Sequence, residues 1–135
     1  MRNQKLDQLV DQVENYIECW KQFNTFVNLA RARKFSPEED NQFLETKSVL
    51  VQELESILAS IDVSSPTRED IHALITEAPS LRYLSELNEG ALRAFESQWH
   101  RIYIGWHAIL GQLKVRQRGE QSKSAIGSVF RKKRK

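Results

Sequence analysis

Apolar residues recur at helical spacing along most of the chain, and the densest run covers residues 95–113. Six of them follow one another at steps of 4, 3, 4, 3 and 4 residues, the spacing of one helix face. These six are Phe95, Trp99, Ile102, Trp106, Ile109 and Leu113. Tyr103, Ile104 and Leu110 widen this face, and a helix with so broad an apolar surface needs several partners. The pattern predicts that residues 95–113 form the central helix of a bundle.

A second long pattern predicts a helix over residues 3–34. Its apolar positions alternate steps of 3 and 4 residues for more than three heptads, which is typical of coiled-coil packing. They are Leu6, Leu9, Val13, Tyr16, Trp20, Phe23, Val27 and Ala30. Ser36, Pro37 and Glu39 then form the pattern of a capping box with proline at the first helical position. They predict a second helix over residues 37–60, which the short connection makes antiparallel to the first.

Further breaks divide the remaining chain. Ser65 or Thr67 is expected to cap a short helix that ends near residue 77, and Ser80 is expected to cap a long helix over residues 81–116. No stretch shows the alternation of a strand. The predicted fold is therefore all-α, an antiparallel bundle of three long helices plus one short helix.

The helical spacing of apolar residues ends near Gln117, and the residues that follow are rich in Gly, Ser and charged side chains. We therefore predict a helical bundle domain over residues 1–117 and a flexible basic tail over residues 118–135. Three glycines, Gly90, Gly105 and Gly111, lie inside the last predicted helix. We expect them to mark places where a neighbouring backbone comes close.

The surplus apolar surface of residues 95–113 and the sustained heptads of residues 3–34 suggest a homodimer. The alternative is that the broad apolar face is filled within one chain. The residues expected at its interface are Trp99, Ile102, Tyr103, Trp106 and Leu110.

Charge is distributed very unevenly. Residues 1–113 hold 11 Lys or Arg and 17 Asp or Glu, a net charge of −6. Residues 114–135 hold 9 Lys or Arg and 1 Glu, a net charge of +8. The chain ends in five cations, Arg131, Lys132, Lys133, Arg134 and Lys135. They predict contact with an anionic partner, either a membrane surface or nucleic acid. The alternative is a solvated charge run without a partner.

Candidate chemistry is sparse. Glu96, His100 and His107 share one side of the last helix with Tyr103, and could hold a metal or move protons. The alternative is a polar edge beside the apolar face. Glu69 and His72 have the spacing of half a di-iron site, but no second Glu-x-x-His follows. We therefore expect no cofactor, no metal and no small-molecule substrate.

The composition indicates where in the cell the protein is expected. The chain has 135 residues, one cysteine, no apolar leader at its start and no run of about 18 apolar residues. The cytoplasm is therefore the expected location, and Cys19 is expected to be a small core residue.

Three hypotheses for function follow. The first is a non-enzymatic helical adaptor whose basic tail contacts the anionic partner. The second is a helix-binding chaperone, of the general shape of small export chaperones in bacterial secretion systems. The third is a metal- or His-dependent enzyme built around Glu96, His100 and His107.

Overall fold

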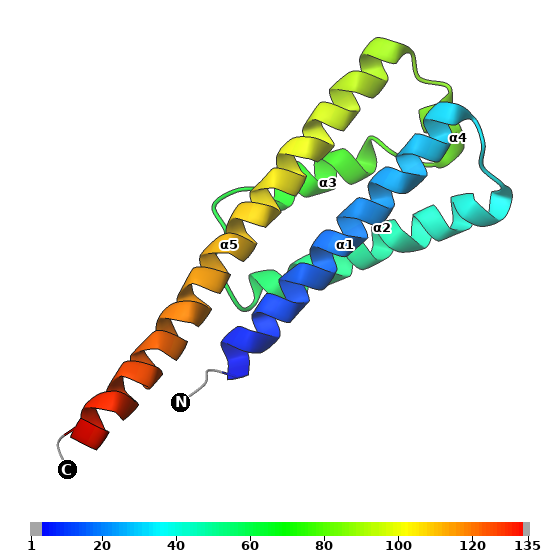
Figure 1. Ribbon diagram of the computed structural model, residues 1–135. Coiled ribbons are helices and arrows are strands. Elements are labelled where there is room, and N and C mark those ends of the chain that lie inside the picture. The colour runs from blue at the N-terminus through cyan, green and yellow to red at the C-terminus, as the bar shows by residue number, and fades with distance from the viewer. Residues whose placement is uncertain (1–3, 134–135) are drawn as a thin grey trace.

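The computed structural model describes residues 4–133, and their side chains as far as Glu120. Five helices follow in chain order, and no strand occurs within residues 4–133 (Figure 1). They are α1 (Gln4–Ala32), α2 (Pro37–Leu58), α3 (Arg68–Thr76), α4 (Leu81–Ser85) and α5 (Glu89–Lys133). The all-α prediction is confirmed for this part of the chain.

Local hydrogen bonds explain where α2 and α3 begin. The Ser36 side chain accepts from the backbone N–H of Glu39, whose carboxylate accepts from the backbone N–H of Ser36. Thr67 and Asp70 form the same reciprocal pair at the start of α3. Each pair satisfies backbone donors that the first turn of a helix leaves without partners. The capping box predicted at Ser36 is confirmed, and Thr67 rather than Ser65 caps α3.

The prediction of one long helix over residues 81–116 is wrong at its start, because the structure has two helices there, α4 and α5. The Asn88 side chain accepts from the backbone N–H of Ala91 at 2.7 Å, as an N-cap residue does. The break turns α4 so that Leu81 and Leu84 are fully buried. Continuous apolar spacing across residues 84–92 concealed it from sequence reasoning.

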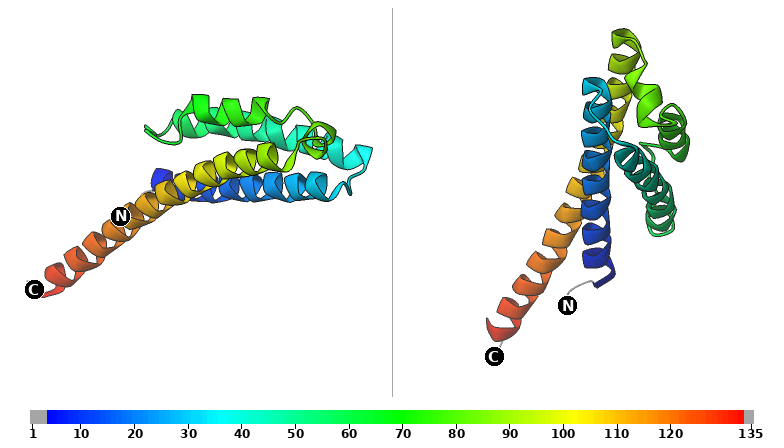
Figure 2. Two further views of the ribbon diagram at one scale, coloured as in Figure 1. Left: turned by 90° about the horizontal axis from the view of Figure 1, so that it is seen from above. Right: turned by 90° about the vertical axis from the view of Figure 1, so that its right-hand side faces the viewer.

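The central helix is α1, not the stretch of residues 95–113. It packs against α2, α4 and α5, and eleven of its residues are buried. Figure 2 shows α1 and α5 antiparallel in one layer, with α2 and α3 in a second layer. The broad apolar surface of α5 is only partly used, because Ile104 and Val115 remain 51% and 59% exposed.

Aromatic side chains join the helices within a layer and between the layers. The Tyr16 ring meets the Trp106 ring edge-on at 4.9 Å between centroids, and Phe23 lies 5.1 Å from Phe43. The Tyr16 hydroxyl donates to the backbone oxygen of Leu50 at 2.8 Å, which links α1 to α2. Such buried contacts hold α2 and α5, the other two long helices, against α1.

The C-terminal part of α5 differs from the predicted flexible tail. The helix crosses residue 118 without a break and continues to Lys133, away from the other helices (Figures 1 and 2). No proline occurs after Leu113, and Arg, Lys, Gln and Glu are good helix formers. The predicted boundary at residue 117 lies inside this helix, and the division into a bundle domain and a tail stays a prediction. We call residues 118–133 the α5 extension.

Candidate functional site

The polar residues singled out on α5 do not converge on one point. Glu96 forms an ion pair with Arg31 of α1, and His100 is exposed to solvent. His107 is also exposed and lies edge-on to the Tyr103 ring, 4.6 Å between centroids. Within residues 4–120, no group of three His, Cys, Asp or Glu side chains is placed to hold a metal ion. The polar-edge interpretation of these residues agrees with this geometry.

An aromatic ladder runs along the same edge of α5. Tyr103 is half-buried and stacks on Trp99, with 4.8 Å between ring centroids. The Trp99 indole N–H donates to the backbone oxygen of Trp20 at 3.1 Å. The ladder therefore joins α5 to α1.

The residues predicted for a dimer interface lie mostly in the core of the single chain. Trp99, Ile102, Trp106 and Leu110 are each no more than 9% exposed. Because they pack inside the chain, they offer little surface to a second copy. The homodimer itself stays a prediction.

Cys19 is half-buried beside the core of α1. Burial raises the pKa of its thiol, and the carboxylates of Glu53 and Glu18 raise it further. A raised pKa lowers the thiolate fraction at neutral pH and opposes nucleophilic chemistry.

We therefore expect iodoacetamide near neutral pH to alkylate Cys19 several-fold more slowly in the folded protein than in urea, because folding both raises the thiol pKa and restricts access. The rate is measured by mass spectrometry, with Cys19→Ser as the background control. A faster reaction in the folded protein would instead identify an activated thiol.

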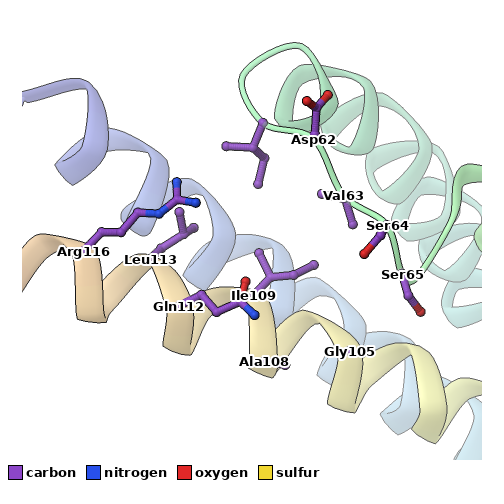
Figure 3. A pocket seen from close by; sticks show the side chains of 11 residues that line it. Asp62, Val63, Ser64, Ser65, Gly105, Ala108, Ile109, Gln112, Leu113 and Arg116 are labelled. Atoms are coloured by element: carbon purple, nitrogen blue, oxygen red, sulfur yellow. The ribbon is translucent and has the colours of Figure 1, made fainter.

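A crevice of about 310 Å³ opens between α5 and the loop that joins α2 to α3 (Figure 3). Its lining residues are Ile61, Asp62, Val63, Ser64, Ser65, Gly105, Ala108, Ile109, Gln112, Leu113 and Arg116. Val63, Ile109 and Leu113 supply apolar surface, while Asp62 and Arg116 bring opposite charges from the two walls. The volume is at the lower end for small-molecule pockets. Among the described residues that line it, none is histidine or cysteine, and Asp62 is its carboxylate.

The absence of a side chain at Gly105 allows the two walls to meet. A Cβ atom built there would lie 2.8 Å from Cδ of Pro66, whereas one at Gly111 would have no neighbour within 4 Å. The close approach expected at the three glycines is thus confirmed at Gly105. It is wrong at Gly111 and at Gly90, where a Cβ atom would meet only the side chain of Asn88 at 3.5 Å among the described residues. Sequence reasoning missed the crevice, because its walls come from distant parts of the chain.

The basic part of α5 is the most distinctive charged feature. No Asp or Glu occurs from residue 97 to residue 119, a stretch that contains Arg101, Lys114, Arg116 and Arg118. Arg101, Arg116 and Arg118 are exposed, while Lys114 lies 3.8 Å from Glu14 of α1. Of the five terminal cations, Arg134 and Lys135 lie outside the described residues, and the side chains of Arg131, Lys132 and Lys133 lie outside those described.

Comparisons with known proteins assign no family to this all-α protein: no family model, no curated protein and no solved structure matches the chain. Among the helices of residues 4–133, none is long and apolar enough to cross a membrane.

Proposed function

We propose that this protein is a non-enzymatic adaptor that uses the basic end of α5 to bind an anionic membrane surface. The observation that supports this proposal most strongly is the course of α5, which leaves the bundle and leads directly into the charged end of the chain (Figure 1). The bundle then remains free to bind a protein partner.

The separation of charge explains how an acidic protein can approach an anionic surface. Residues 1–113 carry a net charge of −6, and residues 114–135 carry +8. At about 1.5 Å per residue, the α5 extension is roughly 24 Å long. This length exceeds the Debye length of about 8 Å at physiological ionic strength, so repulsion from the bundle is screened at the far end.

The composition of the chain end favours a membrane over nucleic acid. Ile126, Val129 and Phe130 directly precede the five cations in the sequence. Apolar residues beside cations suit a lipid interface, where each Lys or Arg near the surface contributes about 1 kcal/mol. Binding to nucleic acid by counterion release requires the cations alone. The expected location in the cytoplasm agrees with this proposal, because the cytoplasmic leaflet carries anionic lipids.

The geometry of the remaining surface favours an adaptor over the two other hypotheses. The polar residues of α5 do not converge: Glu96 pairs with Arg31, His107 contacts the Tyr103 ring, and His100 is exposed to solvent. Catalysis would need them to converge on one point. The crevice beside α5 has room for a few side chains but not for a whole client helix.

The test compares the full chain with a chain that ends at Gln117, using vesicles with and without phosphatidylserine. We expect the full chain to bind the anionic vesicles at least about tenfold more tightly than the shortened chain, given about 1 kcal/mol per surface cation. Binding should weaken as salt is raised. A matched control replaces Arg131, Lys132, Lys133, Arg134 and Lys135 with glutamine and keeps the chain length.

Two results would contradict the proposal. One is equal vesicle binding by the full, shortened and glutamine-substituted chains. The other is tight binding of an RNA oligonucleotide by the full chain without binding to anionic vesicles, which would assign the cations to nucleic acid.

A further inference from the structure

The side of α5 that faces away from the core carries an exposed apolar stripe. Ile104 and Val115 are 51% and 59% exposed, the highest values among the exposed large hydrophobic residues of the described side chains. Ala108 and Gly111 lie between them and are also exposed. The four residues follow one another at steps of 4, 3 and 4 and therefore share one helix face. We call Ile104, Ala108, Gly111 and Val115 the outer stripe.

Exposed cations accompany the outer stripe. Arg101, Arg116 and Arg118 are exposed on the same helix, and no acid occurs on α5 from residue 97 to residue 119. Two acidic side chains of α1 lie beside this part of α5: Glu14, which lies 3.8 Å from Lys114, and Asp7, which accepts a hydrogen bond from Gln117 at 2.6 Å. An apolar strip with cations beside it is the pattern of a helix that lies in a membrane interface.

We propose that the outer stripe lies on the anionic membrane surface, so that α5 binds along its side and not only through its end. This inference rests on the proposed function and extends its binding surface into residues 104–115 of the bundle. There the exposed arginines beside the stripe, and not distance from the bundle, offset the repulsion by the acids of α1. The stripe belongs to the same continuous helix as the basic end, so both parts lie on one element. Binding along the side requires no further folding of residues 101–118, because α1 already holds them as helix.

Charge selects this occupant over a second copy of the chain. Two outer stripes in contact would bring Arg101, Arg116 and Arg118 of one chain close to the same cations of the other. The shape of the outer stripe also favours lipid over an acidic helix as the partner. The stripe lies on the outward side of a single helix, and of its four residues only Ala108 also lines the crevice. A lipid surface adapts to such a side, whereas a bound helix requires a groove.

The experiment replaces the two large residues of the stripe, Ile104→Gln and Val115→Gln, in the full chain. The matched control is Leu44→Gln with Val49→Gln, two residues of α2 that are 42% and 40% exposed. We expect the stripe variant to bind phosphatidylserine vesicles about five- to tenfold more weakly than the unaltered chain, because burial of apolar area contributes to interfacial binding. The α2 control should bind as the unaltered chain does. Both variants should keep the same circular dichroism and unfolding midpoint.

A second measurement locates the contact directly. A polarity-sensitive fluorophore is attached at Ala108→Cys or, as the control, at Val49→Cys, each in a chain with Cys19→Ser. We expect the emission from position 108 to shift to the blue on anionic vesicles, and the emission from position 49 to stay unchanged.

The outcomes separate this inference from the proposed function. If the full chain fails to bind anionic vesicles at all, the proposed function fails and the inference fails with it. If the full chain binds, but the stripe variant binds equally well and position 108 shows no shift, only the inference fails. If sedimentation shows a dimer that the stripe variant dissociates, or if an acidic helical peptide shifts position 108 and vesicles do not, the stripe belongs to a protein partner and the inference is overturned.

Discussion

Replacement of Trp106 by alanine is expected to lower the free energy of unfolding by about 3–5 kcal/mol. Trp106 is fully buried, and its ring meets the Tyr16 ring at the contact between α5 and α1. Among the described residues its indole N–H has no hydrogen-bond partner, and the expected loss comes from packing and apolar burial. The change would leave a cavity that the neighbouring aromatic side chains fill only in part. Urea unfolding followed by circular dichroism measures it.

The control for this prediction is Val115→Ala on the same helix. Val115 is 59% exposed, so its removal should change the free energy of unfolding by no more than about 0.5 kcal/mol. If Trp106→Ala were equally mild, α5 would not pack on α1 as described. The proposed membrane contact would then need a different framework, because a rigid α5 depends on this packing.

A methyl group at Gly105 is expected to have the second large effect. The new Cβ would lie 2.8 Å from Cδ of Pro66, a buried ring that cannot rotate out of the way. Crowding of this kind costs about 1–3 kcal/mol, against a gain of about 1 kcal/mol from replacing glycine within a helix. The loop of residues 61–66 should therefore move away from α5, and the free energy of unfolding should fall.

Gly111→Ala is the matched control, because it makes the same change on the same helix with no neighbour within 4 Å. It should raise the free energy of unfolding by up to about 1 kcal/mol, so the two alanine variants should differ by roughly 2 kcal/mol. The measurement is again urea unfolding. Similar shifts for both variants would show that the loop does not touch α5 at Gly105.

Capping signals were predictable because they are local. Ser36 and Glu39 lie three residues apart, and their hydrogen bonds involve only each other's backbone and side chains. Asn88 has the same kind of role at the start of α5, but the apolar spacing around it continues without a gap and suggested one helix. A polar cap residue can therefore begin a helix even where the apolar pattern continues without interruption.

The candidate surfaces were predictable only in part. The concentration of cations after residue 113 is visible in the sequence, and so is the helical spacing of Ile104, Ala108 and Val115. Spacing alone assigned all apolar residues of this helix to partners, because it cannot tell which side of a broad apolar helix is covered. The crevice depends on Gly105 and Pro66 coming together, which no local pattern indicates.

The sequence by itself determined that this chain is helical and where most of its helices begin, because periodicity and capping act within a few residues. Only the tertiary structure decided that α1 is the central helix, that Trp99 and Trp106 are core residues, and that Ile104 and Val115 remain exposed. The physical reason is that burial depends on contacts between segments far apart in the chain. Two helices with equally apolar faces differ only in how many neighbours the fold places around them.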